Sequence, residues 1–265
     1  LELPVNFSVL EEIIHRGVLR AGYVEGRLPF TFHNEAGDLV GFDVEILNIL
    51  AREMGVKLEF VPLHWDTLYD QVNSDEVDIV GTVPLTTELL VNLDLSDPYL
   101  EGALSAVVRD HRRRDFSERA RWLKQVELTV AYPRPIEYIR SAVELSAPDI
   151  RINWVEIDSL KEFFEQEGES IDALIIQAEI GTAWTLLHPE YTVIQFESAK
   201  LNIPAGFAVP KGQYDFAALL GRWISAKQST GDIQIAYDYW ILGKGAEKKE
   251  PRWSIMKDVL GWTLD

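Results

Sequence analysis

The residues of this chain that could do chemistry are mostly charged side chains in predicted loops. Arg27 follows a predicted buried strand, and Arg134 stands beside the predicted start of a helix. A planar guanidinium can pair with both oxygens of a carboxylate, so either residue could bind an anionic ligand. Each could equally be an exposed loop arginine, and the sequence alone leaves both interpretations open.

The composition argues against metal, redox and thiol chemistry. The chain contains no cysteine, which excludes disulfides, thiol catalysis and cysteine-ligated zinc. Its five histidines are scattered and include no pair four residues apart. We therefore expect neither a metal site nor a cofactor.

Length and charge narrow the class of protein. The 265 residues are enough for one large domain or two modest ones, and no apolar run approaches the roughly 20 residues that span a bilayer. The net charge of −18 argues against nucleic acid and anionic lipid as partners, because both require a positive surface. Residues 1–8 show no basic and apolar leader, so we expect a signal peptide or upstream segment to have been removed.

Strand and helix patterns alternate in the first third of the chain. Strands are predicted over 19–24, 57–62 and 77–81. Between the first two, a helix is predicted with Asp43 as its N-cap and Gly55 at its C-terminal end. Such alternation predicts a parallel α/β sheet, in which ligands bind outside the carboxyl ends of the strands. The loops that follow these strands are therefore the candidate ligand-binding edge.

The same pattern restarts further along the chain. Strands over 128–131, 152–156 and 173–176 alternate with helices over 137–145 and 159–166. Apolar runs at 104–108 and 205–209 are predicted to carry the chain out of the first unit and back into it. Two crossings between the units are therefore predicted, near 105–109 and 203–209.

Short motifs along most of the chain resemble one protein family. They are Gly17-Val18-Leu19-Arg20-Ala21-Gly22-Tyr23, Pro29-Phe30-Thr31-Phe32, Gly41-Phe42-Asp43, Val77-Asp78-Ile79-Val80, Leu95-Ser96-Asp97-Pro98-Tyr99, Asp172-Ala173 and Tyr239-Trp240. Their order and spacing resemble family 3 of the extracellular solute-binding proteins, which serve amino-acid ABC transporters. The resemblance implies an α/β, two-lobed fold of the type II periplasmic-binding-protein class, with a ligand cleft between the lobes. It also implies that the crossings near 105–109 and 203–209 form a hinge, which closure of two lobes around a ligand requires. Lobe 1 is then expected at 10–105 plus 208–242, and lobe 2 at 108–204.

Three positions depart from the family pattern. Leu89 stands where the family has an arginine for the ligand carboxylate, and Gln177 stands where it has an aspartate for the ammonium group. Two prolines flanking Arg134 replace a Gly-Thr or Gly-Ser turn and remove two backbone donors. Glu179, two residues beyond Gln177, is predicted either to face the cleft or to point away. These departures favour a ligand with more carboxylate and less ammonium character than a neutral amino acid.

The resemblance also identifies residues that would line the cleft. Trp65 matches the family position of an aromatic wall, with a half-buried lobe 1 position as the alternative. Arg27 lies three residues before Phe30, where family members place an aromatic residue that covers the ligand. The predicted ligand-binding set is Arg27, Trp65, Thr82, Thr86, Arg134, Gln177 and Glu179.

The leading interpretation is a non-catalytic, extracytoplasmic module that binds a small polar, carboxylate-bearing metabolite, either an amino acid or an organic acid. We expect a monomer in the periplasm or outside the cell that serves a membrane transporter or receptor. One alternative is a sensory or accessory domain of a larger transporter or sensor kinase. A dehydratase-type enzyme is another, although Ile180 and not Glu179 falls at the general-acid position of that branch. A domain that has lost ligand binding is the third.

The last residues follow a different pattern. Segment 243–265 is predicted to be a C-terminal extension that forms a short helix, with Trp253, Met256 and Leu260 on one face. This face could dock on the chain's own lobe, on a partner, or at a junction with a larger membrane protein.

Overall fold

The computed structural model of this chain describes residues 8–117, 127–133, 140, 150–157, 159–167, 170–195 and 202–244. Arg134, most of the predicted helix over 137–145 and nearly all of the predicted C-terminal extension lie outside these residues. Their predictions therefore stay predictions.

The first part of the chain alternates strands and helices, as the sequence predicts. Its elements are α1 (Val9–Arg16), β1 (Val18–Val24), β2 (Phe32–His33), β3 (Leu39–Val40), α2 (Phe42–Met54), β4 (Lys57–Leu63), a 3-10 turn (Trp65–Thr67), α3 (Leu68–Asn73), β5 (Ile79–Pro84), α4 (Thr87–Asn92) and β6 (Asp94–Leu95).

The pattern resumes after a long strand. The remaining elements are β7 (Leu100–Arg109), a 3-10 turn (Asp110–Arg112), α5 (Arg113–Phe116), β8 (Leu128–Pro133), β9 (Ile152–Ile157), α8 (Leu160–Glu162), a π-helical turn (Phe163–Glu167), β10 (Ala173–Gln177), α9 (Ala178–Leu187), β11 (Tyr191–Gln195), β12 (Asn202–Val209), α10 (Tyr214–Thr230) and α11 (Asp232–Trp240).

The strands follow one path in the order β4-β1-β5-β12-β7-β10-β8-β9, with β6 paired to β12 and β11 paired to β7. At one end, β1 lies parallel to both β4 and β5. At the other end, β8 lies parallel to both β10 and β9. Each end is therefore a small parallel sheet, whose loops gather at the carboxyl ends of its strands.

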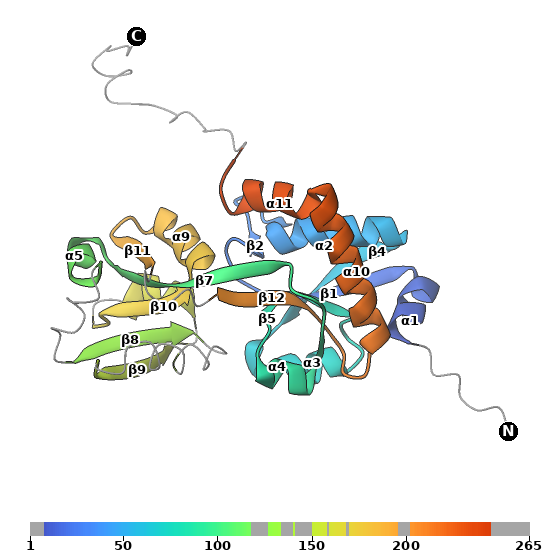
Figure 1. Cartoon of the computed structure of the whole chain (residues 1–265), viewed down its shortest axis with the longest axis horizontal. Helices are drawn as coiled ribbons and strands as arrows, with labels where there is room; N and C mark the ends of the chain where they lie inside the picture. The colour runs from blue at the N-terminus through green and yellow to red at the C-terminus, as the bar shows by residue number, and fades with distance from the viewer. Residues whose placement is uncertain are drawn as a thin grey trace, which may run out of the picture.

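Two antiparallel strands connect these ends. Residues Leu100–Ala103 of β7 pair with Asn202–Ala205 of β12, and the rest of β7 pairs with β10 and β11. Figure 1 shows β7 and β12 running side by side between the two lobes. The predicted two-lobed α/β fold with two crossings is thus confirmed, whereas the residue boundaries of the lobes remain a prediction.

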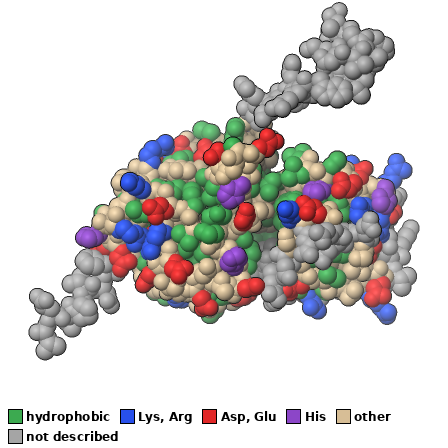
Figure 2. All heavy atoms as spheres, turned by 180° about the vertical axis from the view of Figure 1, so that it is seen from behind, with side chains coloured by type: hydrophobic (Ala, Val, Ile, Leu, Met, Phe, Trp, Pro, Cys, Tyr) green, Lys and Arg blue, Asp and Glu red, His purple; other side chains and the backbone are tan. Residues whose placement is uncertain are grey.

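Apolar packing accompanies each lobe. One cluster of buried residues joins β4, α3, β5 and α4 in the first lobe, and a second joins β7, β8, β10 and β11 in the second lobe. A third, larger cluster contains residues from both lobes. Acidic and basic side chains are interspersed over the face in Figure 2, in keeping with a solvated, net negative surface.

Helix α2 corrects one prediction from the sequence. The prediction that Asp43 caps this helix is wrong, because Gly41 occupies the N-cap position and Asp43 lies inside the first turn. Gly41 has φ 134°, and a Cβ there would lie 2.2 Å from the carbonyl oxygen of Phe30. A residue with a side chain does not fit at this entry. Gly55 ends the helix in a left-handed conformation, which confirms the predicted C-terminal cap.

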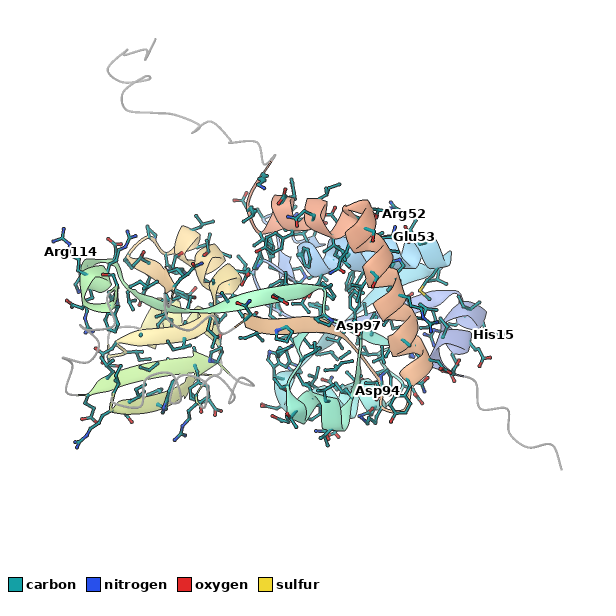
Figure 3. All side chains as sticks on the ribbon, in the orientation of Figure 1. His15, Arg52, Glu53, Asp94, Asp97 and Arg114 are labelled. Carbon is teal, nitrogen blue, oxygen red and sulfur yellow. The ribbon has the colours of Figure 1, made fainter. Side chains whose placement is uncertain are left out.

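The C-terminal helices fold back on the first lobe. Glu53, labelled in Figure 3, lies at the end of α2. It accepts hydrogen bonds from the indole of Trp223 at 2.8 Å and from Lys227 at 2.6 Å, both on α10. Trp240 of α11 donates its indole N–H to Glu45 of α2. The chain that returns through β12 is therefore anchored to the lobe it first left.

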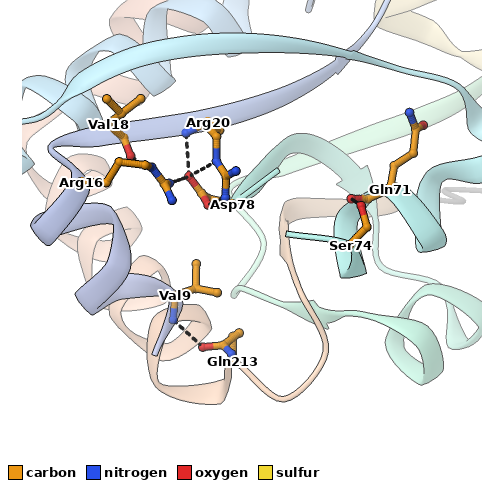
Figure 4. Close-up of polar contacts among 8 residues, drawn as sticks. All are labelled: Val9, Arg16, Val18, Arg20, Gln71, Ser74, Asp78 and Gln213. Atoms are coloured by element: carbon orange, nitrogen blue, oxygen red, sulfur yellow. Dashed lines mark hydrogen bonds and ion pairs between the residues drawn. The ribbon is translucent and has the colours of Figure 1, made fainter. Parts of the chain in front are cut away.

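Two arginines pair with one buried carboxylate between β1 and the start of β5. Asp78, whose side chain is 2% exposed, accepts hydrogen bonds from the Arg20 backbone N–H and the Arg20 guanidinium, each at 2.8 Å. Arg16 also pairs with this carboxylate (Figure 4). Removing the carboxylate leaves two arginines without their shared partner.

We predict that Asp78→Ala lowers the free energy of unfolding by about 1.5–3 kcal/mol, since it removes hydrogen bonds to a charged carboxylate while both arginines keep part of their contact with water. Urea denaturation measures this loss. The control is Asp115→Ala, which removes a half-exposed carboxylate 3.7 Å from Arg112, and a much smaller loss is expected there. Equal losses in the two variants would contradict the role assigned to Asp78.

Candidate functional site

The loops of the first lobe meet at the carboxyl ends of three neighbouring parallel strands. The loop after β1 carries Arg27, and the turn after β4 carries Trp65. Thr82 lies in the last part of β5, and Thr86 follows that strand. Because β1 pairs with both β4 and β5, these four predicted residues lie at one edge of the sheet.

Arg27 is held in a defined position on this edge. Its Nη2 donates a hydrogen bond to the carbonyl oxygen of Thr82 at 3.0 Å. Its guanidinium carbon lies 5.3 Å from the ring centroid of Trp65 and 5.6 Å from that of Phe30, within range for cation–π contact. The side chain is half-buried, so the alternative of a freely exposed loop arginine does not describe it.

Asp43 lies behind Arg27 and was not predicted as a site residue. It is 2% exposed, and its carboxylate accepts a hydrogen bond from the hydroxyl of Thr82. The hydroxyl of Tyr99 lies 3.5 Å from the same oxygen. Burial raises the pKa of Asp43 from 3.8 to about 6, although the nearby Arg27 charge and the two hydroxyls favour the ionised form.

The backbone at Thr82 is adapted to this buried group. Thr82 has φ 32°, an uncommon conformation for a residue other than glycine. The N–H of Thr82 donates to the Tyr99 hydroxyl at 2.7 Å. At Gly81, an added Cβ would lie 2.8 Å from the Asp43 carboxyl carbon, so a side chain there would collide with the carboxylate. Asp43, Gly81, Thr82 and Tyr99 thus form one packed unit.

Thr86 and Leu89 belong to helix α4. Thr86 is the N-cap of that helix, and its hydroxyl accepts a hydrogen bond from the Leu89 N–H at 3.3 Å. Leu89 is 3% exposed and packs in the core cluster of the first lobe. The position where the family carries an arginine therefore holds an inward-facing apolar side chain, and Thr86 stays only a predicted ligand contact.

The second lobe contributes Gln177 and Glu179 next to strand β7. Gln177 ends β10 and is 5% exposed, whereas Glu179 lies in the first turn of α9 and not in a strand. A Cβ added at Gly102 of β7 would lie 3.0 Å from Gln177 Nε2 and 3.2 Å from Glu179 Oε2. The absence of a side chain at Gly102 thus makes room for both polar groups beside the hinge.

Glu179 also contacts the first lobe. Its Oε1 accepts a hydrogen bond from the Tyr237 hydroxyl of α11 at 3.4 Å. Its Oε2 is buried and has no hydrogen-bond partner among the residues that the structure describes. Burial is the main cause that raises the pKa of the Glu179 carboxyl. Arg134, predicted to lie opposite, is outside the described residues.

Two other features are absent from the part of the chain that the structure describes. Within it, no three His, Cys, Asp or Glu side chains come together as a metal site would require. None of the described helices combines the length and hydrophobicity of a membrane span.

The buried Asp43 gives a prediction for stability against pH. Because its pKa is higher in the folded state, its contribution to stability is present below pH 3.8 and is lost as pH rises through about 6. The difference of about two pKa units corresponds to about 3 kcal/mol. Between pH 4 and 7, wild-type protein should therefore lose stability relative to Asp43→Asn. Urea denaturation at several pH values tests this, and identical pH profiles would contradict it.

Comparison with known proteins supplies the family. The model of the bacterial extracellular solute-binding proteins, family 3, matches residues 19–243. The L-cystine-binding protein TcyJ of Escherichia coli (strain K12) is 24% identical over 88% of this chain and 86% of its own length. The cyclohexadienyl dehydratase of Pseudomonas aeruginosa is 23% identical over 90% of this chain and 88% of its own length.

Solved structures agree with this match. The ancestral amino-acid-binding protein AncCDT-1, described as a precursor of cyclohexadienyl dehydratase, superposes with a TM-score of 0.74 at 26% identity, over 88% of this chain and all of that one. The solute receptor for L-cysteine of Neisseria gonorrhoeae gives a TM-score of 0.73 at 25% identity, over 92% and 98% of the two chains. The chain belongs to family 3 of the bacterial extracellular solute-binding proteins.

Proposed function

We propose that this protein binds a small carboxylate-bearing metabolite, an amino acid or an organic acid, between its two lobes without transforming it. It acts outside the cytoplasm as a monomer and presents the ligand to a membrane transporter or receptor. The observation that carries this proposal is the fixed Arg27 guanidinium at the ligand-facing edge of the first lobe. Family membership supports the solute-binding role itself.

Arg27 is a suitable replacement for the arginine that the family has at position 89. A guanidinium held by the Thr82 carbonyl and two aromatic rings has little freedom left to lose when a ligand binds. It keeps its charge at all physiological pH values and can bind both oxygens of a carboxylate. A charge-assisted hydrogen bond of this kind contributes about 1.5–3 kcal/mol.

The second lobe offers a less charged environment at the family's ammonium position. Gln177 is neutral, and Glu179 accepts one hydrogen bond from Tyr237. We therefore expect the protein to favour ligands rich in carboxylate over neutral α-amino acids. L-Cystine, which the relative TcyJ is named for, carries two ammonium groups as well as two carboxylates, so it enters the test panel as a net neutral amino acid.

Alternative uses of the same fold remain open to test. A sensory or accessory domain of a larger membrane protein would bind the same ligand and differ only in its partner. A domain without ligand binding would show no rise in melting temperature with any acid, because only ligands that bind the folded state stabilise it.

A dehydratase-type enzyme is the second candidate, and one observation favours it. The Glu179 carboxyl has a raised pKa, as a general acid requires, and a buried oxygen that accepts no hydrogen bond from the described part of the chain. If the protein binds its ligand without transforming it, incubation with a carboxylated cyclohexadienol releases no product from wild-type protein or from Glu179→Gln. Turnover that Glu179→Gln abolishes would establish the enzyme.

Arg27→Ala is predicted to weaken carboxylate binding by at least about tenfold, the factor that 1.4 kcal/mol gives. Arg27→Lys should fall between wild type and alanine, because it keeps the charge and loses the fork. Isothermal titration calorimetry with succinate, 2-oxoglutarate, L-glutamate, L-cystine and L-arginine measures both effects. Arg222→Ala, which removes an exposed arginine of α10, is the matched control. Tight binding of any panel member that survives Arg27→Ala unchanged would contradict the proposal.

Trp65 should report binding through its fluorescence. A carboxylate that approaches the stacked Arg27 changes the surroundings of this half-buried indole. Trp65→Phe should therefore remove most of the ligand-induced signal, whereas Trp223→Phe on α10 should retain it. A signal that is insensitive to Trp65→Phe would place the ligand elsewhere.

A further inference from the structure

Thr82 joins a cation and a buried anion. Its carbonyl oxygen accepts from the Arg27 guanidinium, and its hydroxyl donates to the Asp43 carboxylate. Its N–H donates to Tyr99, whose hydroxyl lies 2.8 Å from the Thr82 hydroxyl. A ligand carboxylate bound at Arg27 would therefore be separated from the buried Asp43 carboxylate by only two residues, Arg27 and Thr82.

The groups that face Asp43 come from three segments. The loop after β1 supplies Arg27, strand β5 supplies Thr82, and the segment before β7 supplies Tyr99. Arg27 is the charged group among them and favours the ionised form of Asp43 by Coulomb attraction. The pKa of Tyr99 is raised well above its usual value by burial and by Asp43, so this phenol stays neutral. Arg27 therefore supplies the charge compensation for Asp43.

We infer that a carboxylate ligand captured by Arg27 drives protonation of Asp43, so that ligand binding takes up one proton from solvent. This inference rests on the proposed function, because it needs a carboxylate at Arg27. It goes beyond that function by coupling affinity to pH at a residue that the ligand does not touch.

The direction of the coupling follows from electrostatics. A bound carboxylate offsets part of the Arg27 charge and adds a negative charge near Asp43, and both changes favour the neutral carboxyl. The proton comes from water and forms an O–H bond on the Asp43 carboxylate, which can then donate to the Thr82 hydroxyl. In the folded protein without ligand, the pKa of Asp43 is about 6. The carboxyl is therefore mostly ionised at pH 7 before the ligand binds, and it can take up a proton.

Calorimetry in two buffers tests the proton uptake directly. The protein is titrated at pH 7 with 2-oxoglutarate, succinate and L-glutamate, in PIPES and in imidazole. For uptake of one proton, the binding enthalpies measured in the two buffers should differ by the difference between the ionisation enthalpies of the buffers. Affinity should rise as pH falls from 8 towards 6, by at most about tenfold per pH unit, the limit for one proton. Enthalpies that are identical in the two buffers would overturn the inference.

Two variants assign the proton to its site. Asp43→Asn should abolish the buffer dependence of the binding enthalpy. Asp94→Asn should leave it intact, because Asp94 is also buried but lies beside β12 and pairs with Lys211 at 3.3 Å (Figure 3). Buffer dependence that survives in Asp43→Asn would place the proton elsewhere, with Glu179 as the next residue to test.

A measurement on wild-type protein covers the case in which Asp43→Asn does not fold. Carbon-13 NMR of the aspartate carboxyls should show Asp43 titrating near 6 in the free protein and at higher pH when 2-oxoglutarate, succinate or L-glutamate is bound. An unchanged titration with ligand bound would overturn the inference alone. Failure of every acid to bind would instead overturn the proposed function, and this inference with it.

Discussion

The ligand-facing edge of the first lobe depends on the burial of one carboxyl group. The Asp43 carboxylate contacts the hydroxyls of Thr82 and Tyr99, and it fits because Gly81 has no side chain. Burying a carboxylate costs free energy unless the group is paired or hydrogen-bonded. The hydrogen bonds of Asp43 hold Thr82 in an uncommon backbone conformation. That conformation presents the Thr82 carbonyl to Arg27 and so fixes the cation at the edge. The position of Arg27 is therefore a consequence of the hydrogen bonds that the buried Asp43 carboxylate makes.

In the proposed binding mode, the two lobes contribute unequally to the recognition of charge. The first lobe supplies a positioned cation and an aromatic surface, through Arg27 and Trp65. The described part of the second lobe supplies the neutral Gln177 and the half-buried Glu179 beside β7. This distribution differs from what a neutral α-amino acid needs, which is one strong partner for each of its two charges. It instead favours a ligand bound mainly through its carboxylate.

Most of the fold could be predicted because its signals are local. Periodic apolar residues, the left-handed Gly55 and the two apolar crossings each indicate their element directly, and the structure has α2, β7 and β12 where they indicate. The site was harder to predict because it depends on packing between distant segments. Asp43 stands at a helix start, which favours capping, and only the position of β5 reveals that its carboxylate is buried. Likewise, the contact of Glu179 with Tyr237 joins residues 58 positions apart.

The most direct test of this account is to determine the structure of the protein purified without refolding and to identify any compound bound between its lobes. The account predicts a small molecule whose carboxylate lies within hydrogen-bonding distance of the Arg27 guanidinium, with Trp65 beside it. A compound bound without any carboxylate at Arg27, or one whose carboxylate is held by other residues while Arg27 stays on Thr82 alone, would contradict it.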